Sequence, residues 1–169
     1  MGKFHIRLAR EEEGQAIIQL LQETAQWIKE QGINQWQYLL DGGENQEIIQ
    51  CIGKNLTYVV YHQEEMVATF TLYIEQNEWD QYIWEEDSKD AIYLHRLAVK
   101  PSYMKNGVGK EMIHWIETEY QTDKTYFRLD CVAGNEKLNQ FYQKMGFELL
   151  GVSKDHSRYQ KTTVDIKSF

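Results

Sequence analysis

The chain has 169 residues, 42% of them hydrophobic and 13% aromatic, which is enough to fill the core of one compact domain. Its formal net charge of -8 argues against a general nucleic-acid binder, because no basic stripe is present to replace the counterions of a phosphate backbone. An acidic surface instead favours cationic or amine-bearing partners.

The N-terminal residues MGKFHIRLAREEEG contain no apolar signal segment, and Ile6 stands where a myristoylation signal has Ser or Thr. The two cysteines, Cys51 and Cys131, lie far apart, and no Cys/His cluster has zinc spacing. We therefore predict a cytoplasmic protein with one domain over residues 1–169, two buried thiols, no metal site and no membrane anchor.

The first half of the chain predicts a strand, two helices and a hairpin. A short strand, FHIRLA, precedes a helix in REEEGQAIIQLLQETAQWIKEQG, whose apolar residues recur at helical spacing, and GENQEIIQCIG predicts a second, shorter helix. Two β-branched and aromatic runs follow, NLTYVVYH and MVATFTLYIE. Because only the polar residues QEE separate them, we expect an antiparallel hairpin.

The second half alternates between strands and helices after one irregular segment. Residues Gln76 to Asp90 have no clear period, so we interpret them as a long loop, and loops of this length often carry function. The expected elements that follow are strand AIYLHRLAV, a helix from Gly107 to about Gln121, strand YFRLDCVA, helix NEKLNQFYQKMGF, strand FELLGV and an edge strand in the tail RYQKTTVDIKSF.

The segment MKNGVGKEM places Gly107 and Gly109 between a strand and a helix. It is neither a P-loop, which requires GxxxxGK[ST], nor a dinucleotide fingerprint, because methionine occupies the third glycine position. Free N–H groups at the start of a helix bind anions, and diphosphate is the natural ligand. Lys105 and Lys110 add positive charge nearby. A simple tight turn is the alternative interpretation.

These features resemble the GNAT superfamily of acyl-CoA-dependent N-acyltransferases, over about Asn55 to Val152. The family signature, Q/R-x-x-G-x-G/A, follows a strand and precedes a second strand and an Asn-to-Tyr helix; LAV, the loop Met104–Gly109 and NEKLNQFYQKMGF occur here in that order. The resemblance implies a mixed α/β fold with a central, mostly antiparallel, splayed sheet flanked by helices on both faces. Met104 replaces the family's Gln or Arg, so backbone N–H groups and lysines would do more of the phosphate binding.

The same resemblance implies acetyl-CoA as the cofactor. In the family, backbone groups of the strand bearing LAV pair with the pantetheine arm, here at Leu97 and Val99. The residues expected to contact the cofactor are Leu97, Ala98, Val99, Met104, Lys105, Asn106, Gly107, Val108, Gly109, Lys110, Asn135 and Tyr142.

Tyr142 matches the family tyrosine that hydrogen-bonds the CoA sulfur and is proposed to protonate the departing thiolate. A phenol with a pKa of about 10 keeps its proton at neutral pH, which suits this role. A core tyrosine is the alternative. Asn135, at the start of the same helix, is expected to contact the cofactor or to cap the helix.

His95 is the candidate general base. Strand alternation places it on the face of the pantetheine-facing residues, and family members that act on arylalkylamines resemble this strand in carrying histidine there. A histidine with a pKa of about 6.5 can take a proton from an ammonium group near neutral pH. A structural hydrogen-bonding role is the alternative. The loop acids that could serve instead are Glu85, Glu86 and Asp87.

The acceptor pocket, by resemblance, draws on the first helix, the loop after it and the loop before the central strand. Aromatic rings together with acids such as Glu78 and Asp80 could hold a cationic amine, although most aromatics pack in cores. Cys131 has no evident base beside it and direct transfer needs no covalent nucleophile. The candidate acceptor contacts are Trp36, Tyr38, Trp79, Trp84 and Tyr93.

The sequence therefore predicts an acetyl-CoA-dependent N-acetyltransferase that acts on a primary amine, most simply a small molecule, by direct attack in a ternary complex. The alternatives are a non-catalytic acyl-CoA-binding regulatory domain and an enzyme that acetylates protein N-termini or lysines. We expect neither nucleic acid nor membrane as a partner, and exposed strand edges could pair two copies into a homodimer.

Overall fold

The computed structural model describes residues 3–85, Asp87 and residues 90–163. Glu86, one of the candidate bases, lies outside these residues, as does the end of the tail. The strands are β1 (His5–Leu8), β2 (Thr57–His62), β3 (Glu65–Tyr73), β4 (Ala91–Val99), β5 (Tyr126–Val132), β6 (Glu148–Ser153) and β7 (His156–Thr162). The helices are α1 (Gly14–Glu30), α2 (Gln37–Leu40), α3 (Asn45–Gly53), α4 (Glu78–Trp84), α5 (Val108–Glu119) and α6 (Glu136–Lys144), with 3-10 turns at Glu11–Glu13 and Pro101–Tyr103. In the described part of the chain, no helix is long and apolar enough to cross a membrane.

The strands form one sheet in the order β1-β2-β3-β4-β5-β7-β6. The pairs β1–β2, β2–β3, β5–β7 and β6–β7 are antiparallel, whereas β4–β5 is parallel. The predicted mixed α/β class, the mostly antiparallel sheet and the β2–β3 hairpin are confirmed. The chain divides into two compact units, residues 1–71 with 96–112 (unit 1) and residues 72–95 with 113–169 (unit 2); β3, β4 and α5 run from one into the other.

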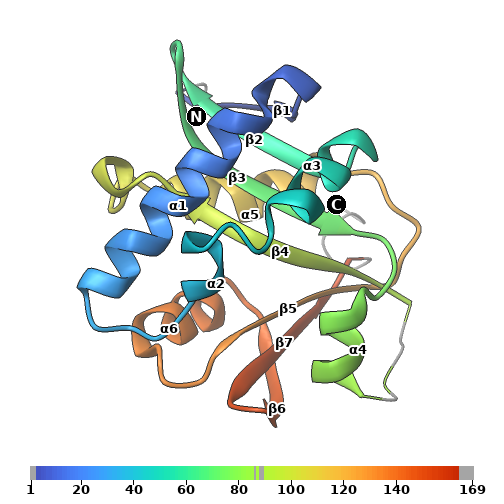
Figure 1. The fold of residues 1–169 in the computed structure, drawn as a ribbon. Coiled ribbons are helices and arrows are strands. Elements are labelled where there is room, and N and C mark those ends of the chain that lie inside the picture. The colour runs from blue at the N-terminus through green and yellow to red at the C-terminus, as the bar shows by residue number, and fades with distance from the viewer. Residues whose placement is uncertain (1–2, 86, 88–89, 164–169) are drawn as a thin grey trace. The chain divides into compact units, whose positions relative to one another are not determined.

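Unit 1 has a core formed by helices packed on strands. The apolar face of α1 contributes Ile17, Leu21 and Ala25, which are buried together with Val59 of β2. These side chains recur every three or four residues, so they lie on one side of the helix and are buried together. Burial of each large apolar side chain stabilises the fold by about 1.5 to 3 kcal/mol. Figure 1 shows α1 crossing in front of β2, and α1 also contacts α2 and α3.

The last strand, β7 of unit 2, was expected at the edge of the sheet, and this part of the prediction was wrong. β7 lies between β5 and β6, pairing with β5 from His156 to Thr162 and with β6 along its other edge. It is therefore an inner strand, and β6 is the edge strand. The alternation in the tail arises because Ser157 and Tyr159 are buried while their neighbours are partly exposed. Alternation of buried and exposed residues also occurs in inner strands of antiparallel sheets that have one face in water. The pattern in the sequence therefore could not tell an inner strand from an edge strand.

The segment interpreted as a long loop contains the helix α4, so that part of the prediction was wrong. Asn77 caps the helix: its side chain accepts from the backbone N–H of Asp80 at 2.8 Å, and the Asp80 carboxylate accepts from the Asn77 N–H at 3.2 Å. This reciprocal capping stabilises the first turn without any long apolar repeat. A helix of seven residues is too short to show a helical period in the sequence.

Candidate functional site

The loop after β4, in unit 1, has the geometry of an anion-binding helix start. Lys105 and Gly107 have positive φ, and α5 begins at Val108. The first intrahelical hydrogen bond runs from the N–H of Glu111 to the carbonyl of Gly107 at 3.0 Å. The N–H groups that precede Glu111 therefore lie at the positive end of the helix dipole. The expected strand, glycine loop and helix are present, and this arrangement suits a phosphate.

The 3-10 turn before this loop is held by the β2–β3 hairpin. The Tyr103 hydroxyl lies 2.9 Å from His62 Nδ1 and donates to Glu65 at 3.1 Å, and Lys100 donates to the same carboxylate at 2.7 Å. The carbonyl of Tyr103 in turn accepts from the N–H of Asn106, inside the loop, at 3.2 Å. These hydrogen bonds fix the position of Tyr103, from which the loop begins.

The end of β4, which is expected to face the cofactor, is not regular. Arg96 has φ of 51°, which interrupts extended backbone, so the simple alternation expected from His95 to Leu97 does not continue through it. Ala98 is buried against the α1 core, whereas Leu97 and Val99 are half-buried. The carbonyl of Val99 accepts from the Thr24 hydroxyl at 3.3 Å. The expected pairing of Leu97 and Val99 with pantetheine stays a prediction.

In unit 2, His95 is held by a buried carboxylate. Its Nε2 atom lies 2.9 and 3.0 Å from the two carboxylate oxygens of Asp80, whose side chain is 1% exposed, against 12% for His95. The Tyr73 ring meets the imidazole edge-on at 4.9 Å. Because an ionised carboxylate only accepts hydrogen bonds, we assign the proton to Nε2, which places the lone pair of the neutral ring on Nδ1.

Asp130 of β5 was not recognised in the sequence. Its two oxygens accept from the indole Nε1–H of Trp79 at 3.2 and 3.1 Å. Desolvation raises the pKa of Asp130, and the Asp80 charge adds to this, although His95, the Trp79 hydrogen bond and His156 act in the opposite direction. The available signal was a lone acid within the apolar run of strand YFRLDCV.

Consecutive residues of α4 connect the two strands. Trp79 reaches Asp130 on β5, and Asp80 reaches His95 on β4. The parallel pairing of these strands covers Ala91–Tyr93 with Tyr126–Arg128, so His95 and Asp130 each follow the paired stretch by two residues. Side chains two residues apart share a face, so both project from the face of the Tyr93–Arg128 pair. The first turn of α4 thus brings together His95, Asp80 and Asp130.

Tyr142 of α6 is buried, with the rings of Phe141, Phe147 and Tyr159 around it. Burial raises the pKa of its phenol, and negative charge on Cys131 or Asp130 raises it further. The hydroxyl therefore remains a proton donor at neutral pH. Asn135 caps α6, because its side chain accepts from the N–H of Leu138 at 3.2 Å.

The alternative covalent nucleophile is disfavoured. Burial raises the pKa of the Cys131 thiol to about 12, with a smaller contribution from the charge of Asp130. A thiol in this state carries almost no thiolate at neutral pH, and the thiolate is the reactive form. Among the described residues, no cluster of three or more His, Cys, Asp or Glu side chains could hold a metal ion.

The five aromatic candidates for the acceptor pocket have different positions. Trp84 and Tyr93 lie in the core of unit 2, where the Arg128 guanidinium stands 4.1 Å from the Trp84 ring and donates to the Tyr93 hydroxyl at 3.1 Å. Both rings are almost completely buried, and their role in acceptor binding stays a prediction. Trp79 is 38% exposed and borders Asp130. In unit 1, Trp36 packs against the α1 core and Tyr38 is exposed.

The two described loop acids form ion pairs. Glu85 accepts from Lys154 at 2.8 Å, and Asp87 accepts from the buried Arg128 at 3.0 Å. Arg128 also donates to Gln160 at 2.8 Å, so Asp87 belongs to the network that fixes β5. Both carboxylates are thus engaged structurally, and His95 remains the better candidate base.

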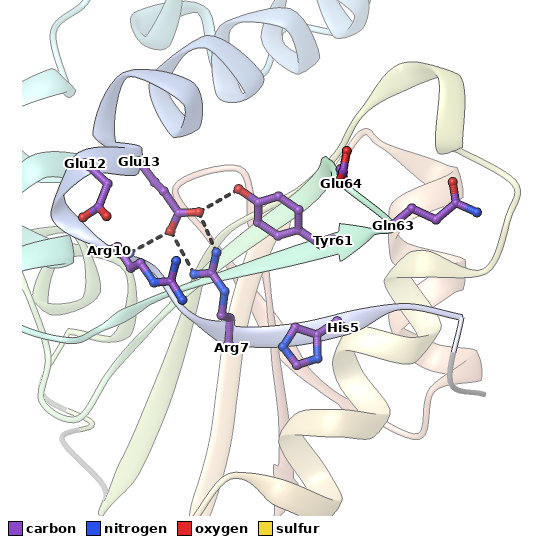
Figure 2. A pocket seen from close by; sticks show the side chains of 8 residues that line it. All are labelled: His5, Arg7, Arg10, Glu12, Glu13, Tyr61, Gln63 and Glu64. Atoms are coloured by element: carbon purple, nitrogen blue, oxygen red, sulfur yellow. Dashed lines mark hydrogen bonds and ion pairs between the residues drawn. The ribbon is translucent and has the colours of Figure 1, made fainter.

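A hollow of about 520 Å³ opens beside β1 in unit 1, and Figure 2 shows Glu13 between Arg7 and Tyr61 among the residues that line it. The Glu13 carboxylate accepts two bonds from Arg7 at 2.9 and 2.7 Å, one from the Tyr61 hydroxyl at 2.6 Å and one from the Arg10 N–H at 2.8 Å. These bonds hold its pKa at about 2, the Arg7 hydrogen bonds being the largest cause. We assign the network a structural role, joining β1 and β2 to the start of α1.

The model of the acetyltransferase (GNAT) family matches residues 14–147. The chain belongs to this family. It is 39% identical over 142 residues to YesJ, an uncharacterised N-acetyltransferase of Bacillus subtilis (strain 168), covering 83% of this chain and 79% of that protein. A GNAT acetyltransferase structure from Listeria monocytogenes is 30% identical, with a TM-score of 0.80 and 94% coverage of each chain. The PaiA N-acetyltransferase of Thermoplasma acidophilum, solved with coenzyme A, shares the fold at a TM-score of 0.71 and 19% identity, over 94% of this chain and 98% of that one. The resemblance found in the sequence is confirmed, and the protein is an N-acetyltransferase.

Proposed function

We propose that this GNAT enzyme transfers the acetyl group of acetyl-CoA to a small-molecule primary amine by direct attack in a ternary complex. The observation that carries the proposal is the His95–Asp80 pair, which provides an oriented imidazole next to a second carboxylate. A base, a proton donor and an anion-binding helix start are the parts that this reaction requires.

The residues of the chain fit the diphosphate of coenzyme A. Gly107 has φ of +79°, and a Cβ added there would meet no heavy atom of the described residues within 4 Å, so space exists in front of the loop. Backbone N–H groups at the start of α5, with Lys105 and Lys110 exposed nearby, would bind the phosphates. The structure of the Thermoplasma acidophilum relative contains coenzyme A, which supports the assignment. The bound cofactor supplies a thioester, whose carbonyl carbon is the electrophile.

The protein's own groups account for each proton. His95 Nδ1 takes a proton from the acceptor ammonium, directly or through water, and Asp80 stabilises the resulting imidazolium. The freed nitrogen lone pair forms the new C–N bond, and the C–S bond breaks as the tetrahedral intermediate collapses. Tyr142 gives its proton to the departing sulfur. The attacking nitrogen releases its second proton, which restores the phenol, and His95 releases the proton that it took to bulk water.

The purified protein should release thiol from acetyl-CoA only when an amine is present. The panel consists of polyamines, arylalkylamines, aminoglycosides and basic peptides, with an amine-free reaction as the control. Release that depends on a small amine supports the proposal and identifies the acceptor class. If only basic peptides support release, a protein acceptor replaces the small molecule. Binding of coenzyme A by calorimetry without any release would contradict the proposed reaction.

A further inference from the structure

Asp130 carries a charge that its protein neighbours compensate less well than that of Asp80. The carboxylate of Asp80 faces the imidazole of His95 and the N–H of Asn77. The donor to Asp130 is the neutral indole of Trp79, and within the described residues no cationic side chain forms an ion pair with Asp130. A desolvated carboxylate with a neutral partner is stabilised when a cation binds to it.

The surroundings of Asp130 are accessible and aromatic. Trp79 is 38% exposed and Tyr82, on the same helix, is 53% exposed, and their rings lie 5.7 Å apart. The imidazole of His156 meets the Trp79 ring edge-on at 4.9 Å. The Tyr82 ring already has Lys154 Nζ 4.9 Å from its centroid, so the ring beside the carboxylate is that of Trp79. An exposed ring beside a carboxylate forms a favourable surface for an organic ammonium, which interacts with both. The charge of Asp130 raises the pKa of Tyr142, the proposed acid, and the charge of His95, the proposed base, lowers the pKa of Asp130.

We propose that Asp130 binds the ammonium group of the acceptor, so that the enzyme selects amines that are protonated in neutral solution. This inference rests on the proposed function and specifies its substrate class. Trp79 is a positioning residue, because its indole N–H fixes the carboxylate. An ammonium held by Asp130 lies near His95, to which it gives its proton, whereas a weakly basic amine lacks the charge that Asp130 recognises.

The alternative is a structural carboxylate that only connects β5 to α4 through Trp79. Asp130→Asn separates the two roles, because the amide oxygen still accepts from the indole while the charge is lost. Asp123→Asn is the matched control, since it makes the same chemical change at an exposed position of the chain. Trp79→Phe keeps an aromatic ring and removes the donor to Asp130.

The test compares two acceptors of nearly equal shape and different basicity. The first acceptor is the most active amine of the panel, and the second is the same amine with two fluorines on the carbon next to the one that bears the nitrogen. For an arylalkylamine, the pair is 2-phenylethylamine and 2,2-difluoro-2-phenylethylamine. The fluorinated amine is largely neutral at pH 8. We expect Asp130→Asn to raise the KM of the protonated amine by about 10- to 100-fold, the contribution of a charged hydrogen bond. The KM of the fluorinated amine and that of acetyl-CoA should change by less than about threefold on the same scale.

Trp79→Phe should raise the KM of the protonated amine by about 2- to 10-fold, consistent with loss of one neutral hydrogen bond. Asp123→Asn should leave the KM of the protonated amine and that of the fluorinated amine unchanged. Equal effects of Asp130→Asn on both amines, or no effect on either, would overturn the inference.

If Asp130→Asn fails to fold, the wild-type enzyme provides the test: added salt should raise the KM of the protonated amine alone. If the wild-type enzyme releases no thiol with any amine, the proposed function itself is wrong, which is a distinct outcome.

Discussion

The Nε2 atom of His95 on β4 and the carboxylate of Asp80 on α4 lie 2.9 Å apart, although the two residues are fifteen positions apart in the chain. The capping box of α4 fixes the carboxylate, and the carboxylate fixes the tautomer of the imidazole. The two residues therefore act as one unit in the proposed proton transfer.

Substitution of either member should remove the function of the pair. Asp80→Asn and His95→Gln should each lower kcat on the order of 100-fold, the typical contribution of a positioned general base. The double variant should be little worse than either single variant, because residues that act as a unit are not additive. In Asp80→Asn the amide oxygen can still accept from the Asn77 N–H, so thermal melting serves as the folding control. Multiplying effects in the double variant would show that the two side chains act independently.

Tyr142→Phe removes the proposed proton donor and keeps the ring in its aromatic surroundings. We expect kcat to fall by about 100- to 10,000-fold while the KM for acetyl-CoA changes little, because the hydroxyl acts on the leaving sulfur. Steady-state kinetics with acetyl-CoA varied gives both parameters. Unchanged turnover would remove Tyr142 from the mechanism and leave it a core residue.

Gly107 should tolerate asparagine better than valine. Its φ of +79° is accessible to asparagine, whereas a β-branched residue is strained there by about 1 to 2 kcal/mol. Gly107→Val should therefore weaken binding of coenzyme A more than Gly107→Asn, measured by calorimetry. Equal losses would indicate that any side chain at this position blocks the phosphates directly, and equal retention would place the diphosphate elsewhere.

Cys131→Ala should retain turnover within a few-fold, since a thiol with a pKa of about 12 is not an acyl carrier. Mass spectrometry of wild-type protein incubated with acetyl-CoA alone should show no acetylated enzyme. A stoichiometric acetyl adduct that is absent from Cys131→Ala, with a matching loss of activity, would replace direct attack with a covalent mechanism.

The Glu13 network should stabilise the fold in a defined pH range. The folded-state pKa of about 2 lies below the ordinary value of 4.5, so the contribution is complete above about pH 4.5 and is lost as the pH falls towards 2. After allowance for solvent screening, we expect Glu13→Gln to reduce the free energy of unfolding at pH 7 by about 1 to 2 kcal/mol. Urea denaturation at pH 7 and pH 3 should show the difference from wild type shrinking at the lower pH. A constant difference would mean that the charge is not the source.

Elements with long patterns were predictable. The apolar stripe of α1 and the β2–β3 hairpin are local signals. The segment before α5 is another, because the positive φ of Gly107 favours glycine. Helix α4 was not predictable by period, since seven residues make fewer than two full repeats, although NEWD carries a capping signature.

The site was predictable only in part, because its partners come together through tertiary structure. His95 and Tyr142 were found by resemblance, whereas the pairing of His95 with Asp80 depends on the position of α4. Asp130 was overlooked because one acid in a strand is weak evidence without its neighbours. For Trp84 and Tyr93, aromatic composition does not show that both rings pack in the core of unit 2 beside Arg128.

The most direct test of this account is the stoichiometry of its products. Purified protein is incubated with acetyl-CoA and the best amine of the panel, free thiol is titrated, and the N-acetylated amine is quantified by mass spectrometry. We predict one N-acetylated amine for each thiol released, with both products reduced in parallel by Tyr142→Phe. Thiol release without N-acetylated amine would show that water is the acceptor and would contradict the proposed transfer.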